Sequence, residues 1–298
     1  MKNVVIIGAG VIGLSWARLF AENGWNVQIS DPRPDLTEVV ERELRGVKVH
    51  LVTDLPTALR EADFVQEAGP ERMDIKREMY ANLAEHTRDD VILASSSSSL
   101  LPSLIAEGNP AAHRILIGHP FNPPELMPLV EVVPGPATEQ RHVDRAVELY
   151  RELGKLPIAL KREIPGFVGN RLQKALGDQA RYLVQEGIIS AGELDQLVRA
   201  SLGLRWAVTG PFESNHLGGG PGGIRHLMEH VGSQMTFEMG EPDPAKTGEI
   251  VTQVEAAYGT GPENYERLAA WRDETTRAVS RALAAHDGGA SAGTEAAA

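Results

Sequence analysis

The sequence predicts an N-terminal α/β domain with a doubly wound parallel sheet, followed by an all-helical C-terminal domain. Two observations predict this fold class. Short apolar runs alternate with helix-like segments through the first half of the 298 residues, and from about residue 164 the apolar residues recur only at helical spacing. Alternating strands and helices are typical of a parallel sheet that is covered on both faces. We therefore expect domains at 1–163 and 164–286, with a disordered tail at 287–298.

The first half begins with the run Val-Val-Ile-Ile at 4–7, which is typical of a parallel strand buried on both faces. A helix at 11–23 and a second strand at 26–31 complete a βαβ unit. Further strands are expected at 47–52, 63–66, 91–94, 115–118 and 129–133, with helices at 54–61 and 74–85. The carboxyl ends of parallel strands meet at one edge of such a sheet, and ligands bind at that edge.

In the second half, apolar side chains from Val168 to Val184 recur at steps of three and four residues, which predicts a long helix with one buried face. Further helices are expected at 192–201, 223–239, 246–258 and 265–285. The segment 287–298 is rich in glycine and alanine and has little to bury, so we expect it to be disordered.

The composition excludes several classes of function. The formal net charge of −12 disfavours nucleic acid and anionic membrane surfaces as partners, because both require a basic face. The chain has no cysteine, which rules out disulfides, thiolate nucleophiles and cysteine-ligated metal sites. No apolar stretch is long enough to span a bilayer and the chain opens directly with a strand, so we expect a cytoplasmic protein.

Three glycines follow the first strand in the pattern Gly8-x-Gly10-x-x-Gly13. Between a strand and a helix, such glycines allow a tight turn, the close approach of a pyrophosphate, and the packing of the helix on the strand. Asp31 ends the second strand, where its carboxylate can accept hydrogen bonds from an adenosine ribose. A carboxylate there repels a 2′-phosphate and favours NAD over NADP, although Arg33 argues weakly for the opposite preference. The pattern predicts a Rossmann NAD-binding domain.

Serines occupy all five positions from Ser95 to Ser99, between the strand at 91–94 and a helix start. This turn belongs to the ligand-binding edge of the predicted sheet. Its hydroxyls can hold a carboxamide or a substrate oxygen, although at least two are expected only to cap the helix. We take Ser96 as a candidate cofactor contact and Ser98 as a candidate substrate contact.

A histidine, His119, lies in the proline-rich sequence Gly-His-Pro-Phe-Asn-Pro-Pro at 118–124. A histidine held in this way is a candidate base for taking a proton from an alcohol, and Asn122 adds an amide that can contact substrate. Glu131 is the single acid of the apolar strand at 129–133, and its burial requires a partner. A carboxylate behind an imidazole fixes the tautomer of the ring, so we expect His119 and Glu131 to form a base dyad. For either residue alone, a structural role is the better explanation.

Two further features leave alternatives open. Residues 226–230, His-Leu-Met-Glu-His, match an inverted zinc-peptidase motif, but an amphipathic surface helix explains them better because no third ligand is evident nearby. We therefore expect no metal. Arg205 lies in a glycine-flanked segment, where it could clamp a substrate carboxylate or form a salt bridge with Glu213, and the sequence does not decide between these.

Four segments together resemble the 3-hydroxyacyl-CoA dehydrogenase superfamily. In that superfamily a Ser-Asn-Thr-Ser-Ser turn precedes a His-x-x-Asn-Pro loop, a Leu-Val-Glu-Val strand and the motif Gly-Phe-x-x-Asn-Arg-Leu. This chain has the serines at 95–99, His-Pro-Phe-Asn-Pro at 119–123, Leu-Val-Glu-Val at 129–132 and Gly-Phe-Val-Gly-Asn-Arg-Leu at 166–172. The resemblance extends from residue 2 to about 285, and it is greatest to the L-gulonate 3-dehydrogenase (lambda-crystallin) and L-carnitine dehydrogenase branch.

The resemblance implies roles for the matched residues. His119 would be the general base and Glu131 its orienting acid, while Ser98 and Asn170 would hold the reacting oxygen. The resemblance also implies that the helical domain pairs two subunits into a homodimer.

By the same match, Glu71 and Lys76 would lie beside the nicotinamide half of the cofactor. The chain departs from the acyl-CoA enzymes after its second strand, because their coenzyme A-binding helical hairpin is reduced here to residues 32–46. These features predict an NAD-dependent enzyme that interconverts the hydroxyl of a small polar 3-hydroxy acid, gulonate- or carnitine-like, with its ketone. The alternatives are a 3-hydroxyacyl-CoA dehydrogenase and a non-catalytic, crystallin-like nucleotide-binding protein.

Overall fold

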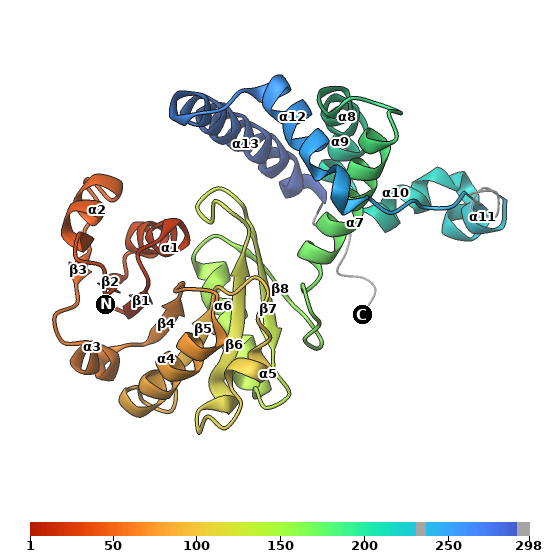
Figure 1. Cartoon of the computed structure of the whole chain (residues 1–298). Helices are drawn as coiled ribbons and strands as arrows, with labels where there is room; N and C mark the ends of the chain where they lie inside the picture. The colour runs from red at the N-terminus through yellow and green to blue at the C-terminus, as the bar shows by residue number, and fades with distance from the viewer. Residues whose placement is uncertain (231–236, 291–298) are drawn as a thin grey trace. The chain divides into compact units, whose positions relative to one another are not determined.

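A computed structural model describes residues 1–230 and 237–290 of the chain (Figure 1). The chain forms two compact units, which divide between Arg171 and Leu172. The first unit contains a sheet with helices on both faces, and the described residues of the second are helices and their connections. The predicted fold class is therefore confirmed.

An eight-stranded sheet in the order β3-β2-β1-β4-β5-β6-β7-β8 forms the centre of the first unit. The strands are β1 (Asn3–Ile7), β2 (Asn26–Ser30), β3 (His50–Leu51), β4 (Phe64–Glu67), β5 (Ile92–Ser95), β6 (Ile115–Pro120), β7 (Leu129–Pro134) and β8 (Leu156–Ala159). The first six strands of this order are parallel and have the arrangement of a Rossmann sheet.

The last two strands depart from the fully parallel sheet that the sequence predicts. Strand β7 runs antiparallel to β6, because residues 121–128 form only a short loop and a parallel connection needs a longer crossover. Strand β8, which the sequence analysis missed, pairs parallel with β7 at the edge of the sheet. Its side chains Leu156 and Ile158 are exposed, and its four residues include a proline. It therefore lacks the continuous apolar run by which the other strands were predicted.

Two apolar clusters cover the two faces of the sheet. Strand β1 contributes to both, because Val4 and Ile6 face one cluster while Val5 and Ile7 face the other. One cluster includes side chains from α1, α2 and α6, and the other includes side chains from α3, α4 and α5. These helices are α1 (Val11–Glu22), α2 (Leu36–Glu43), α3 (Leu55–Glu61), α4 (Met73–His86), α5 (Pro102–Ile105) and α6 (Gln140–Glu152).

The turns that follow β1, β4 and β5 lie next to one another at the carboxyl edge of the sheet. The Ala68 amide donates to the Ile7 carbonyl at 2.7 Å, and the Ser96 amide donates to the Glu67 carbonyl at 2.7 Å. Parallel pairing therefore continues for one residue beyond each strand, and the turn after β4 lies between the glycine turn and the serine turn.

The second unit is reached through α7 (Gly169–Gln185), which begins in the first unit. The elements that follow are α8 (Ala191–Val198), a π-helical turn (Arg199–Gly203), α9 (Leu204–Val208), α10 (Pro211–Gly218), α11 (Gly223–His230), α12 (Thr247–Tyr258) and α13 (Pro262–Ala290). The helix predicted at 223–239 is too long, since residues 237–239 are not helical and 231–236 lie outside the described residues.

Helix α13 includes residues 287–290, which the sequence assigned to the tail, and the rest of that expected tail lies outside the described residues. No helix in the described part of the chain combines the length and apolar character needed to cross a membrane.

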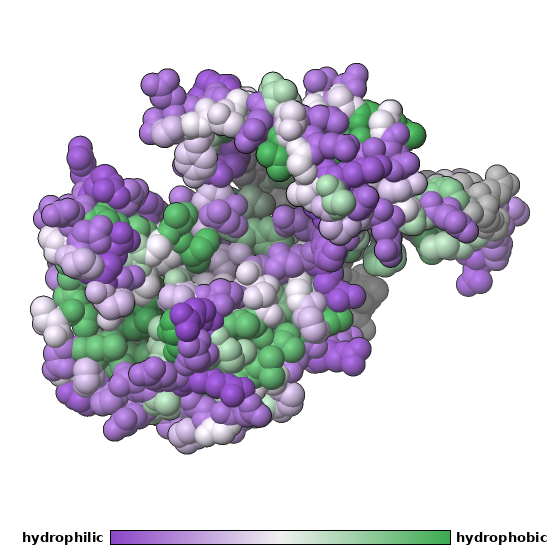
Figure 2. Space-filling model, in the orientation of Figure 1, coloured by the Kyte–Doolittle hydropathy of each residue, from purple (hydrophilic) through white to green (hydrophobic). Residues whose placement is uncertain are grey.

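The second unit exposes many apolar side chains, and apolar residues, green in Figure 2, reach its surface. Phe212 is 79% exposed and Trp271 is 50% exposed. Among the side chains described from Leu172 onward, Val184 and Ala191 are the buried apolar ones. The described residues of this unit form no closed apolar core comparable to the two clusters of the first unit.

Candidate active site

The glycine turn after β1 requires glycine at two of its three positions. Gly8 has a φ of +103°, and a Cβ atom there would lie 2.6 Å from the Ala68 carbonyl oxygen. A Cβ on Gly13 would lie 1.9 Å from the Gly8 carbonyl oxygen. At Gly10, by contrast, a Cβ would meet no atom within 4 Å, so this glycine leaves open space at the start of α1. An anion can approach the backbone amides of the helix N-terminus through this space.

The carboxylate of Asp31 is fixed by the same turn. Its Oδ2 accepts the Ala9 amide at 2.7 Å, and its Oδ1 accepts the Arg33 amide at 2.9 Å. The Arg33 guanidinium forms an ion pair with Asp35 at 2.7 Å. Arg33 is therefore occupied by an acid, and the acid at the end of β2 remains the group that would face a ribose.

A cavity of about 1000 Å³ lies beside Gly10 and Asp31. The turn after β4 and one side of α4 form its opposite wall, with Pro70 and Met79 among the lining residues. Its position at the carboxyl edge of a Rossmann sheet is where such folds bind a dinucleotide. The bare Gly10, the fixed Asp31 and this cavity together suit NAD.

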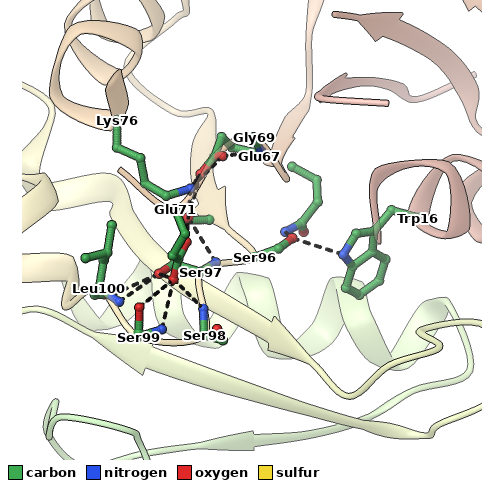
Figure 3. Close-up of polar contacts among 12 residues, drawn as sticks. Trp16, Glu67, Gly69, Glu71, Lys76, Ser96, Ser97, Ser98, Ser99 and Leu100 are labelled. Atoms are coloured by element: carbon green, nitrogen blue, oxygen red, sulfur yellow. Dashed lines mark hydrogen bonds and ion pairs between the residues drawn. The ribbon is translucent and has the colours of Figure 1, made fainter. Parts of the chain in front are cut away.

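Ser95 ends β5, and Ser96 to Ser99 form the turn that follows it (Figure 3). Four of these five serines have hydroxyls that bond within the protein. The Ser95 hydroxyl donates to Glu67, and those of Ser97 and Ser99 donate to Glu71. Ser97 also caps the following turn by accepting the Leu100 amide at 2.9 Å. Ser98 is exposed, and its hydroxyl makes no hydrogen bond to any residue that the structure describes.

The position of Ser96 does not favour the cofactor contact expected of it. Its hydroxyl accepts hydrogen bonds from Trp16 Nε1 at 3.1 Å and from Gln66 Nε2 at 2.8 Å. Gln66 in turn accepts from the buried Tyr150 hydroxyl at 2.7 Å. A serine at this position satisfies buried polar groups of the core, and the pattern of five serines does not distinguish it from its neighbours.

Glu67, at the end of β4, is a residue that the sequence analysis missed. It is fully buried and holds the ammonium of Lys76 at 2.7 and 2.8 Å from its two carboxylate oxygens (Figure 3). The resemblance implies that Lys76 lies beside the nicotinamide half of the cofactor. Lys76 is only 1% exposed, so its side chain lies beneath the protein surface at this position. An acid that ends an apolar strand was a usable signal, since the same signal identified Asp31.

The structure brings His119 and Glu131 together. The antiparallel register of β6 and β7 places them directly opposite each other, and His119 Nδ1 lies 2.8 Å from Glu131 Oε2. The Oε1 atom of Glu131 accepts the amides of Val168 at 2.9 Å and Gly169 at 3.0 Å, at the start of α7. Burial raises the pKa of the Glu131 carboxyl, but the hydrogen bonds from His119 and from these amides outweigh it and lower the pKa overall. Glu131 is therefore an anion at neutral pH.

Two aromatic rings enclose the imidazole. The ring centroids of Phe121 and Phe167 lie 5.6 and 5.5 Å from that of His119, whose exposed fraction is 6%. Phe167 is fully buried with a φ of +47°, which is unfavourable for a non-glycine residue. A Cβ on Gly169 would lie 2.3 Å from Phe121 Cζ, so a larger residue there would require the Phe121 ring to shift. Within the described residues, Nε2 of His119 makes no hydrogen bond and is the ring atom left for a proton transfer.

The side chains of the two candidate asparagines, Asn170 and Asn122, differ in their surroundings. Asn170 lies at the start of α7, and its Nδ2 donates to the Ser98 carbonyl oxygen at 2.8 Å. Asn122 is exposed and makes no side-chain hydrogen bond to a described residue. Two hydrogen bonds hold the loop between β6 and β7 at positions after Asn122. The Glu125 amide donates to Ser15 Oγ at 3.0 Å, and Lys155 donates to the Met127 carbonyl at 3.1 Å.

The two motifs with open alternatives lie in the second unit. Arg205 is on α9 and exposed, and it forms no ion pair with Glu213 or any other described residue. His226 and His230 lie one turn apart on α11, with ring centroids 4.4 Å apart. Within residues 1–230 and 237–290 there is no group of three or more histidine or acidic side chains that could hold a metal ion.

Known proteins resemble this chain along most of its length. Residues 3–164 match the NAD-binding domain of 3-hydroxyacyl-CoA dehydrogenase, and residues 166–247 match its C-terminal domain. A protein from Gibberella moniliformis called 3-hydroxyacyl-CoA dehydrogenase is 44% identical over 78% of each chain. An L-carnitine dehydrogenase from a Pseudomonas species is 34% identical over 95% of this chain and 94% of that one.

A solved structure supports the same assignment over nearly the whole chain. It is an NAD⁺-dependent dismutase described as 5-formyl-3-hydroxy-2-methylpyridine 4-carboxylic acid 5-dehydrogenase, with a TM-score of 0.82 and 27% sequence identity over 95% of this chain and 98% of that one. Family models and relatives thus cover both units that the fold defines. The protein belongs to the 3-hydroxyacyl-CoA dehydrogenase family and is an NAD-dependent oxidoreductase of the kind that acts on CH–OH groups.

Proposed function

We propose that this protein interconverts the hydroxyl of a small polar 3-hydroxy acid with its ketone, and that His119 is the general base. The observation that carries the proposal is the contact between His119 Nδ1 and the buried, anionic Glu131. Because Glu131 accepts a hydrogen bond from Nδ1–H, the neutral ring has its lone pair at Nε2. That atom can take the alcohol proton.

The remaining groups of the site orient the substrate. The Ser98 hydroxyl, which bonds to none of the residues that the structure describes, can donate to the reacting oxygen, and Phe121 and Phe167 exclude water from the imidazole. Bound NAD⁺ supplies the hydride acceptor, and Gly10 and Asp31 are the residues that would hold it. A base and a donor fixed in advance around one oxygen lower the barrier by orientation as well as by charge.

The substrate proposal rests on the relatives and on the short segment after β2. Relatives named L-carnitine dehydrogenase match nearly the full chain, and carnitine is a small polar 3-hydroxy acid. The segment between β2 and β3 holds only the eight-residue helix α2. A second candidate, a 3-hydroxyacyl-CoA thioester, is favoured by the name of the Gibberella relative.

A substrate panel tests the proposal. The protein is assayed with NAD⁺ by NADH absorbance on L-carnitine, L-gulonate, free 3-hydroxybutyrate and 3-hydroxybutyryl-CoA. We expect at least one free acid to have a higher kcat/KM than the thioester. A clear preference for the thioester would overturn the substrate proposal, and binding of NADH without turnover of any panel member would favour a non-catalytic role. In the same assay, Arg205→Ala should raise KM if Arg205 binds the substrate carboxylate.

We further infer that the second unit pairs with a second copy of the chain. Its exposed side chains include Leu172, Phe212, Leu217, Tyr265 and Trp271, and among its described residues few apolar side chains are buried. Exposed apolar area on this scale is typical of a protein interface. Sedimentation or light scattering should give twice the chain mass, and a concentration-independent monomer would contradict the inference.

A further inference from the structure

Arg33 and Asp35 belong to the segment between β2 and α2, beside the cavity that suits NAD. The Arg33 side chain lines this cavity together with Asp31 and Gly10. Asp35 holds its guanidinium through two parallel hydrogen bonds, from Nε to Oδ1 at 2.7 Å and from Nη2 to Oδ2 at 3.1 Å. A longer hydrogen bond joins Nη1 to the Ala9 carbonyl of the glycine turn at 3.4 Å. An acid therefore fixes the guanidinium at the wall of the cavity.

The Asp35 side chain contacts Arg33 and does not cap its own helix. Asp35 is the N-cap residue of α2, and its carbonyl accepts the Val39 amide at 3.0 Å. An aspartate at this position ordinarily accepts a backbone amide of the first turn through its side chain, which stabilises the helix. Within the described part of the chain, the Asp35 side chain makes no such bond. Its carboxylate is thus left for the contact with Arg33.

Asp31 is engaged in a different way. Its two oxygens accept backbone amides, one from Ala9 and one from Arg33. These bonds hold the carboxylate at the end of β2, where an acid faces the adenosine ribose in folds of this kind. The segment therefore contains two acids with separate partners, because amides hold Asp31 and a guanidinium holds Asp35.

An arginine at this place in a Rossmann fold is a group that can accommodate the 2′-phosphate of NADP. A guanidinium binds a phosphate best through two parallel hydrogen bonds. In this chain, Nε and Nη2 of Arg33 already donate to Asp35 in that way. A 2′-phosphate would have to displace the carboxylate, which would then remain nearby as a second negative charge and repel it.

We propose that Asp35 is a specificity-determining residue for the cofactor, which disfavours NADP by occupying the Arg33 guanidinium. Asp31 is expected to repel a 2′-phosphate directly, whereas Asp35 withholds the cation that could offset this repulsion. The proposal concerns cofactor binding alone, so it does not depend on the substrate or on the base proposed above.

A cycle of two substitutions tests whether Asp35 acts through Arg33. The Kd values of NADH and NADPH are measured by fluorescence titration for the parent, Asp35→Asn, Arg33→Ala and the double variant, and again with Asp31→Ser added to each. Asparagine is as good an N-cap residue as aspartate, so Asp35→Asn should fold like the parent, which circular dichroism checks. We expect Asp35→Asn to lower the Kd of NADPH by about threefold to tenfold, and to leave that of NADH within about twofold, because exposed charges interact weakly in water.

The effect of Arg33→Ala should depend on whether Asp35 is present. While Asp35 occupies the guanidinium, Arg33→Ala should change the Kd of NADPH by less than about twofold, whereas in Asp35→Asn it should raise that Kd by about threefold to tenfold. Additive effects would overturn the proposal, since Asp35 would then act by its own repulsion of the phosphate. An unchanged NADPH affinity in Asp35→Asn, or no measurable NADPH binding after Asp31→Ser is added to it, would overturn it as well.

Asp90→Asn is the matched control. Asp90 is also exposed and pairs with an arginine two residues before it, Arg88, at 3.2 Å. It lies just before β5, at the amino edge of the sheet, whereas the cavity lies at the carboxyl edge. The variant loses the same charge far from the cavity, so both Kd values should stay within about twofold of the parent. A gain in NADPH affinity as large as that of Asp35→Asn would show that net charge, and not Arg33, controls the preference. If Asp31→Ser narrows the gap between the cofactors while the cycle is additive, only the role of Asp35 fails.

Discussion

Replacing Glu131 by glutamine tests the base dyad more sharply than removing the histidine. The side chain keeps its size but has one oxygen and one NH₂ group in place of two oxygens. In the parent, Oε2 faces His119 Nδ1 at 2.8 Å, and Oε1 accepts the amides of Val168 and Gly169. Both groups that face the parental carboxylate are donors, namely Nδ1–H of His119 and the two backbone amides. A carboxamide has one oxygen, so its NH₂ group must face one of these donors.

Both orientations of the carboxamide carry a penalty. If its oxygen faces the two amides, its NH₂ donates to Nδ1 and the ring proton moves to Nε2, which can then no longer accept the alcohol proton. If its oxygen faces Nδ1, the NH₂ opposes two buried amides, and each unsatisfied donor costs about 1–3 kcal/mol. A loss of about 2–4 kcal/mol in the competent state corresponds to a kcat lower by roughly 30-fold to 10³-fold.

Steady-state NADH absorbance with the best panel substrate measures this loss. NADH affinity should change by less than about twofold, since Glu131 is not proposed to contact the cofactor. Circular dichroism shows whether the variant is folded, and Glu85→Gln, at an exposed site on α4, controls for the loss of one carboxylate. A folded Glu131→Gln variant with a kcat within about threefold of the parent would mean that the carboxylate does not set the state of His119, and the dyad would have to be abandoned.

Three further predictions follow from the same site. His119→Gln should lower kcat by on the order of 10²-fold to 10⁴-fold with NADH affinity nearly unchanged, and a folded variant with near-parental turnover would move the base elsewhere. NAD should bind at least about tenfold more tightly than NADP, a difference of about 1.4 kcal/mol, and Asp31→Ser should narrow this gap; equal affinities in a fluorescence titration would assign the dominant effect to Arg33. Because the pKa of Glu131 is lowered in the folded state, its ionisation stabilises the fold above the ordinary carboxyl pKa of 4.5, and this contribution is lost as the pH falls through the lowered value. Urea unfolding should therefore show a difference between the parent and Glu131→Gln that shrinks below about pH 4.5, and a difference that grew towards acid pH would contradict the assignment.

The sequence by itself determined the fold class and the chemical inventory of the site. Both depend on short-range signals in the sequence. The spacing of apolar residues distinguishes a strand from a helix, and the glycine turn requires a strand before it and a helix after it. The glycine at residue 8 is predictable in this way, because its positive φ belongs to the turn itself. A lone acid in an apolar strand likewise indicated that Glu131 needs a partner.

Tertiary structure decided which of these groups act on one another. Register between β6 and β7 places His119 opposite Glu131, and a shift of one residue would turn the two side chains to opposite faces. Nothing local distinguishes Ser98 from Ser96, yet packing against Trp16 occupies the Ser96 hydroxyl, whereas the Ser98 hydroxyl has no partner among the described residues.

The same distinction applies to the charged groups beneath the turn. Glu67 and Lys76 are nine positions apart and no local pattern pairs them, but the packing of α4 on the sheet buries both as a pair. Whether a polar group faces solvent, substrate or another protein group depends on burial, and burial is set by segments distant in the sequence. Residue types and local periodicity therefore determined what chemistry this protein carries, whereas packing determined which atoms remain available to perform it.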